Sequence, residues 1–195
     1  MYKYTLCLLA LLLTTSLSAR ETQPLYRNPQ ATPEARTEDL LRRMTLAEKI
    51  AQMQHIHFGH FDSDGRFDPE KLRRSTDGLS RGCAEAFPYS AEQYLLTMME
   101  IQREMRENTR LGIPVFPVLE GLHGVVQNGC TIFPQSIAVA ATFDPGYAEA
   151  MGRIVGREAR AIGGRQVLAP VLDIAREHRW GRVEETYGED PYLTE

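Results

Sequence analysis

The sequence lacks any excess of positive charge. Its 22 Lys and Arg residues are outnumbered by 26 Asp and Glu residues, which gives a formal net charge of −4 at pH 7. Proteins that bind nucleic acids need a basic face for the phosphates, so this balance argues against a nucleic-acid partner. The composition also lacks the biases of disordered, collagen-like and repeat proteins, and 195 residues suffice for one domain with a buried core.

Long apolar runs are scarce as well, and the main one lies at the N-terminus. Lys3 precedes a leucine-rich run at residues 6–13, and small residues follow up to Ala19. A positive residue, a short apolar core and a small-residue cleavage zone are typical of a secretory signal peptide, which we assign to residues 1–19. The run is too short to span a bilayer, so we predict an exported protein, secreted or periplasmic, with no membrane span.

Cysteine is rare too, with three residues in the chain, of which Cys83 and Cys130 lie beyond the predicted signal peptide. An exported protein can pair two cysteines in a disulfide. Two cysteines in a domain of this size can equally stay free, and the sequence leaves both alternatives open.

Complete metal-binding patterns are absent from the sequence. Residues 62–65, Asp-Ser-Asp-Gly, resemble the start of a calcium loop but lack its later ligands, so we predict a plain turn. His55, His57 and His60 have no nearby cysteine to complete a zinc site, and we expect them to face solvent. We therefore expect neither a metal nor an organic cofactor.

The region after the signal peptide is expected to begin with an extended, proline-containing lead-in at residues 20–36 and a short helix at residues 37–44. A capping box at Thr45 and Glu48 starts the next helix, because both side chains can satisfy free N–H groups. The buried face of that helix is expected to consist of Leu46, Ile50 and Met53.

Two longer helices are expected after a polar, irregular stretch at residues 58–89. The first, residues 90–110, opens with the capping box Ser-Ala-Glu-Gln, and the second, residues 144–162, is capped by Asp144 and stops at a glycine pair. The first helix carries an apolar stripe typical of core packing, formed by Tyr94, Met98, Ile101 and Met105.

Two strands are expected between and after these helices. They are predicted at residues 113–119, where Pro117 implies a bulge, and at residues 167–172, an apolar run typical of a buried strand. The order helix, strand, helix, strand indicates a parallel α/β sheet, either open and doubly wound or closed into a barrel.

The segment 176–191 is the most distinctive part of the sequence. It combines three arginines, several carboxylates and the single tryptophan of the chain directly behind the second predicted strand. Arginines and carboxylates form directional hydrogen bonds, and Trp180 offers a flat apolar face, which together suit a polyhydroxylated ligand. The alternative is a surface loop held by salt bridges.

Four segments, in the same order along the chain, resemble the N-terminal domain of glycoside hydrolase family 3, which includes β-glucosidases and β-xylosidases. They are residues 44–53, 111–125, 131–145 and 176–191. One departure is His178, where the family has proline. The resemblance implies that residues 37–195 form the truncated N-terminal part, roughly the first half, of a (β/α)8 TIM-type barrel, since a full barrel needs about 250 residues.

The resemblance also implies roles for particular residues. Glu120, which follows a predicted strand, corresponds to the carboxylate that grips the hydroxyls of the terminal sugar. An arginine of the segment 176–191 acts in the same subsite. We favour Arg182 and expect Arg179 to brace the loop. His123 is expected to order the loop after Glu120, and Trp180 either packs beneath its loop or faces the sugar.

The family's nucleophile and acid/base residue match nothing in this sequence and are expected beyond Glu195, so we predict that the chain alone is inactive. The resemblance implies an exo-acting, retaining β-glycosidase that removes terminal β-linked sugars from oligosaccharides or from aryl and alkyl glycosides. A β-glucosidase is the first expectation and a β-xylosidase the second. The alternative from another class is a secreted, non-catalytic carbohydrate-binding protein. The sequence leaves the oligomeric state open.

Overall fold

The computed structural model describes residues 23–85 and 89–195, which divide into two compact units at Thr45 and Leu46. The predicted signal peptide lies outside the described residues. The first unit contains a 3-10 helix, η1 (Leu25–Arg27), and the helix α2 (Pro33–Arg43).

The start of α2 differs from the sequence-based expectation. The Thr32 hydroxyl accepts a hydrogen bond from the Ala35 N–H at 3.2 Å, and Pro33 occupies the first turn, where its missing N–H costs nothing. These two features start the helix at Pro33 and not at residue 37. The extended lead-in predicted for residues 20–36 is therefore wrong over its last residues.

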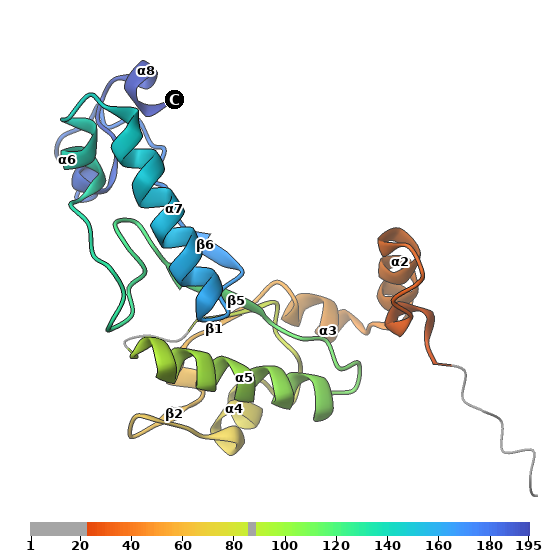
Figure 1. Cartoon of the computed structure of the whole chain (residues 1–195). Coiled ribbons are helices and arrows are strands. Elements are labelled where there is room, and N and C mark those ends of the chain that lie inside the picture. Colours follow the sequence, from red (N-terminus) through yellow and green to blue (C-terminus); the bar gives the residue numbers. More distant parts are fainter. Residues whose placement is uncertain (1–22, 86–88) are drawn as a thin grey trace, which may run out of the picture. The chain divides into compact units, whose positions relative to one another are not determined.

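The second unit, Leu46–Glu195, is built on a four-stranded parallel sheet with the strand order β1-β4-β5-β6 (Figure 1). A separate antiparallel hairpin pairs β2 with β3. The strands are β1 (His55–Ile56), β2 (Asp62–Ser63), β3 (Arg66–Phe67), β4 (Cys83–Glu85), β5 (Phe116–Glu120) and β6 (Gln166–Leu168). The predicted α/β class with a parallel sheet is confirmed.

Helices alternate with the strands of this sheet. They are α3 (Leu46–Ala51), η2 (Phe58–His60), α4 (Pro69–Ser75), α5 (Ala91–Glu107), α6 (Ser136–Ala140), α7 (Pro145–Ala161), η3 (Val183–Glu185) and α8 (Pro191–Thr194). The predicted capping box of α5 is present, because Ser90 and Gln93 each satisfy the other's backbone N–H at 3.1 Å. Asp144 caps α7 by accepting from the Gly146 N–H at 2.9 Å, also as predicted.

One face of the sheet forms the core with α5 and α7, the two long helices labelled in Figure 1. The strand register places Ile56, Ala84 and Leu119 on this face, and each is at most 1% exposed. The predicted stripe of α5, Tyr94, Met98, Ile101 and Met105, packs in the same cluster. From α7 the cluster includes Met151, Val155 and Ala159. Because alternate strand residues point to opposite faces, the remaining strand residues face the other way.

That second face, the open face, follows from the strand register. It carries His55, Cys83, Glu85, Phe116, Val118, Glu120, Gln166 and Leu168. Phe116 is 51% exposed and Leu168 is 40% exposed, so no described segment covers this part of the sheet. Phe116 and Leu168 are therefore accessible, whereas Val118 on the same face is 3% exposed.

The buried face predicted for α3 is wrong. Leu46, Ile50 and Met53 are 74%, 50% and 87% exposed. The inward side of α3 is formed instead by Ala51 and by Glu48, whose carboxylate binds Arg110. An ion pair, which periodicity of apolar residues does not reveal, anchors this helix.

The stretch 58–89, predicted to be irregular, contains α4, the β2–β3 hairpin and the interior strand β4. Residues 62–65 include the turn of the β2–β3 hairpin, in which the Gly65 N–H donates to Asp62 Oδ1 at 3.0 Å. A strand as short as β4 has no detectable periodicity, which explains why it is not predicted.

The two predicted strands are both shorter than expected. The register of β5 is unbroken, so the bulge expected at Pro117 is absent, and the Pro117 carbonyl accepts from the Arg165 N–H at 2.9 Å. β6 ends at Leu168, and Leu172 is 59% exposed. The run 167–172 is not a buried strand because β6 lies at the edge of the sheet and Pro170 has no N–H to continue the ladder.

Both Cys83 and Cys130 are free thiols, so the disulfide alternative is not realised. Within residues 23–85 and 89–195, no group of three or more His, Cys, Asp or Glu side chains is placed to hold a metal ion. No helix in the same ranges is both long and apolar enough to cross a bilayer.

Candidate functional site

Two carboxylates end neighbouring strands of the parallel sheet. Glu120 is the last residue of β5 and Glu85 is the last residue of β4, and both belong to the open face. His55, from β1, places its Nε2 3.6 Å from Glu85 Oε2. The carboxyl ends of parallel strands are where α/β folds bind their ligands, so this edge is the candidate site.

The surroundings of this edge raise the pKa values of both carboxyls. Burial raises the pKa of Glu120 above its ordinary value, the neighbouring Glu85 raises it further, and Arg182 lowers it. Burial also raises the pKa of Glu85 and lowers the pKa of His55. A polar, uncharged ligand can form hydrogen bonds with these side chains without adding a further charge to the site.

Gly121 fixes the path of the chain directly after Glu120. A Cβ atom at this position would lie 2.3 Å from Val167 Cγ1, so the backbone approaches β6 more closely than any side chain allows. The following turn is closed by the Val126 N–H, which donates to the Glu120 carbonyl at 3.1 Å. The glycine therefore lets β5 end beside β6 with Glu120 at the rim.

The two predicted arginines differ in their surroundings. Arg182 donates from Nη2 to Glu185 Oε2 at 2.6 Å, and its charge lowers the pKa of Glu120. Arg179 is 89% exposed and binds Glu177, whose pKa its hydrogen bonds lower to about 2. The structure thus brings Arg182 into the electrostatic field of Glu120, while Arg179 is committed to its neighbour in the loop.

His123 contacts the far end of the loop that follows Glu120. Its Nδ1 lies 3.0 Å from the Phe133 carbonyl oxygen, and the Phe133 N–H donates back to the His123 carbonyl at 2.7 Å. The paired contacts join both ends of this loop. Trp180 is half-buried, and its two alternative roles, packing beneath the loop or facing the sugar, stay predictions.

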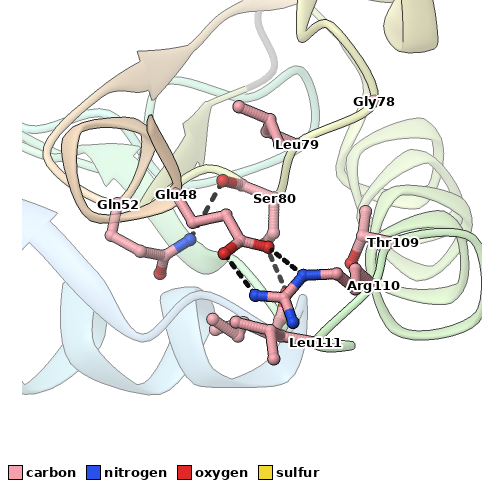
Figure 2. A pocket seen from close by; sticks show the side chains of 9 residues that line it. Glu48, Gln52, Gly78, Leu79, Ser80, Thr109, Arg110 and Leu111 are labelled. Carbon is pink, nitrogen blue, oxygen red and sulfur yellow. Dashed lines mark hydrogen bonds and ion pairs between the residues drawn. The ribbon is translucent and has the colours of Figure 1, made fainter. Parts of the chain in front are cut away.

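A small cavity lies at the opposite end of the sheet (Figure 2). Its lining residues precede β1, β4 and β5 in the chain, so they sit at the amino ends of these strands. Its space is about 10 Å³, roughly that of one water molecule. Figure 2 shows Glu48 bridged to Arg110, with Nε to Oε1 at 2.9 Å, and Gln52 Nε2 donating to the Ser80 carbonyl at 3.0 Å. This clasp holds α3 against the segments that lead into the strands and is not a ligand site.

The sequence predicts Glu120 and Arg182 as site residues but not Glu85, and His55 is expected from it only to face solvent. Both missing residues belong to strands of two or three residues, β1 and β4. The short string Gly82-Cys83-Ala84-Glu85, which ends on an acidic residue just before a helix cap, is the signal that could have indicated a strand end.

Comparison with known proteins shows which family the second unit belongs to. The sequence profile of the glycosyl hydrolase family 3 N-terminal domain matches residues 45–195. The chain is 31% identical over 192 residues to a periplasmic β-glucosidase of Salmonella typhimurium, covering 97% of this chain and 23% of that protein. It is 42% identical over 100 residues to a β-xylosidase of Formosa agariphila, covering 48% of this chain and 14% of the other.

Solved structures agree. A β-glucosidase from Erythrobacter marinus superposes with a TM-score of 0.73 at 31% identity, over 88% of this chain and 23% of the other. A β-glucosidase from Listeria innocua in complex with isofagomine has a TM-score of 0.65 at 33% identity, over 84% and 21%. The parallel sheet thus matches part of these larger structures, and the chain spans about a quarter of the length of such relatives. The chain belongs to glycoside hydrolase family 3 and carries the sequence of its N-terminal domain.

Proposed function

We propose that the whole protein is an exported, exo-acting, retaining β-glycosidase and that this chain forms the part of its active site that holds the terminal sugar. The observation that carries the proposal is the position of Glu120, a half-buried carboxylate at the carboxyl end of a parallel strand, within the field of Arg182. Export rests on the predicted signal peptide at residues 1–19, and a relative from Salmonella typhimurium is named as periplasmic.

In this proposal each residue of the chain has a binding role. Glu120 accepts hydrogen bonds from adjacent sugar hydroxyls, Arg182 donates to an oxygen of the same sugar, and His123 keeps the loop after Glu120 in place. Arg179 braces the loop through Glu177. These contacts fix the sugar before the bond that is cleaved.

The chemistry of retention requires a second set of residues. A carboxylate attacks the anomeric carbon and a second group protonates the leaving oxygen, and the two carboxyl groups of retaining enzymes lie about 5–5.5 Å apart. Glu184 and Glu185 are poor candidates for this pair, because Glu185 is bound by Arg182 and Glu184 faces solvent. We assign the nucleophile and the acid/base to parts of the whole protein outside this chain.

The sugar is proposed to be β-linked glucose, with β-linked xylose as the second choice. Relatives with both names match this chain. The two sugars differ by one CH₂OH group, so the pocket volume beside the sugar ring decides between them.

The test is hydrolysis of nitrophenyl β-glucoside and β-xyloside by the whole protein and by the 195-residue chain. We expect turnover by the whole protein only. The Glu120→Gln variant should lose about 10- to 100-fold in kcat/KM, because a charge-assisted hydrogen bond to the sugar is weakened. The Glu92→Gln variant, at an exposed position on α5, is the matched control and should retain full activity.

Two results would contradict the proposal. Hydrolysis by the short chain would require a catalytic carboxylate pair among residues assigned here to binding or structure. Sugar binding by the whole protein without any turnover would instead fit a non-catalytic, secreted carbohydrate-binding protein.

A further inference from the structure

Glu85 lies in the sheet beside the carboxylate to which the proposed function assigns sugar binding. The register pairs Glu85 with Val118, two residues before Glu120 on the adjacent strand, so Glu85 and Glu120 project from the same face. Strands are about 4.8 Å apart and rise about 3.3 Å per residue, so the two residues are diagonal neighbours. Side chains at this separation can reach neighbouring hydroxyls of a single sugar ring.

Glu85 differs from two other largely buried carboxylates of the second unit in the side chain that contacts it. The side chains of Glu48 and Glu104 are each 10% exposed, and arginine binds both, Arg110 in one case and Arg73 in the other. The Glu85 side chain is 12% exposed, and its ion-pairing contact is His55 at 3.6 Å. The structural carboxylates are therefore held by permanent cations, whereas Glu85 faces an imidazole.

That imidazole does not neutralise Glu85 at neutral pH. Burial lowers the pKa of His55 below its ordinary value of 6.5, His60 lowers it further and Glu120 opposes the shift, so the neutral ring predominates at pH 7. Of the other charged groups at this edge, Glu120 and Glu185 are acidic, and Arg182 is already bound to Glu185. A carboxyl group in these surroundings lowers the stability of the folded protein. Residues that destabilise the fold without forming a compensating interaction are concentrated at binding sites.

We propose that Glu85 is a substrate-binding residue that accepts a hydrogen bond from a hydroxyl of the same sugar that Glu120 holds, with His55 orienting its carboxyl group. The ligand class is a pyranose with vicinal hydroxyls, so that two diagonal carboxyls are both satisfied by one ring. The inference rests on the proposed function, since it concerns the same sugar and the same edge of the sheet.

The test compares Glu85→Gln with the wild-type whole protein, with Glu92→Gln as the exposed control. Glu85→Gln should lower kcat/KM for the preferred nitrophenyl glycoside by about 10- to 100-fold, mainly through KM. The same substitution should raise Tm at pH 7, because it removes a carboxylate whose folded-state pKa is raised. The Tm gain should vanish as the pH falls below the ordinary carboxyl value of 4.5, where the wild-type side chain is neutral in both states.

Monodeoxy analogues of the nitrophenyl glycoside separate contact from structure. If Glu85 holds one hydroxyl, the loss caused by Glu85→Gln should disappear for the analogue that lacks that hydroxyl and persist for the others. A merely structural role predicts the same loss with every analogue and a lower Tm. That outcome would overturn the inference.

The remaining outcomes distinguish this inference from the proposed function. If the wild-type protein hydrolyses the substrate and Glu85→Gln has the same kcat/KM, the inference is wrong and the proposed function still holds. The wild-type protein could instead bind glucose or xylose in calorimetry without hydrolysing the nitrophenyl glycosides. The sugar affinity of Glu85→Gln is then compared with that of the wild type, and an unchanged affinity overturns the inference. If it neither binds nor cleaves these sugars, both are wrong.

Discussion

The two arginines of the segment 176–191 should contribute very differently to activity. Arg182 acts on the pKa of Glu120, whereas Arg179 is 89% exposed and bound to Glu177. We expect Arg182→Ala to lower kcat/KM of the whole protein by about 100-fold, since a charge-assisted contact to the sugar is lost. Arg179→Ala should change kcat/KM by less than about threefold, the range of an exposed ion pair. Steady-state kinetics on the nitrophenyl glycosides measure both.

The reverse ranking of these two variants would show that the loop rearranges when the sugar binds. Arg182→Lys is a useful intermediate, because lysine keeps the charge but loses the planar fork that binds two oxygens at once. If Arg182→Lys recovers most of the activity, charge alone matters at this position.

Single site residues could be predicted only where a sequence motif surrounds them. Glu120 follows a recognisable strand and Arg182 lies in a distinctive segment, so the family resemblance could suggest a role for both. Glu85 and His55 belong to strands too short for any pattern, and only the register of the folded sheet places them beside Glu120. Whether these residues contact sugar stays a prediction.

Among the elements, β4 depends on close packing at Gly82. A Cβ atom there would lie 2.0 Å from the Gln52 carbonyl oxygen, and the Gly82 backbone also bonds Gln54 and Phe116. Gly82→Ala should therefore push β4 away from β1 and β5 and destabilise the whole protein by about 3 kcal/mol. Thermal and urea unfolding, followed by circular dichroism, measure the change.

Gly152 provides the matched control for this substitution. It is an exposed position inside α7, and among the described residues nothing lies within 4 Å of an added Cβ. Gly152→Ala should stabilise the protein by about 0.5–1 kcal/mol, because alanine is the better helix former and restricts the unfolded chain. Equal effects of the two substitutions would contradict the packing assigned to β4.

The difference between local signals and packing of distant segments explains which elements the sequence predicts. α5 and α7 are long, capped by Ser90 and Asp144 and periodic on one face, so their signals are local. The exposure of the α3 apolar residues and the edge position of β6 depend on which segments pack nearby, and no local pattern contains that information. Short strands and the burial of individual faces are therefore the part that sequence alone does not supply.

At the level of the whole molecule, the open face predicts how the isolated 195-residue chain behaves. Phe116 and Leu168 are exposed there by 51% and 40%, and no described strand pairs with the outer edge of β1 or β6. Exposed apolar side chains and unpaired strand edges both promote association. We expect the chain alone to self-associate at micromolar concentration and to bind the dye ANS, as measured by light scattering and fluorescence.

Leu168→Lys should reduce both signals, because a charge on the edge strand opposes stacking. A monodisperse monomer that binds no dye would mean that the chain covers this face by itself.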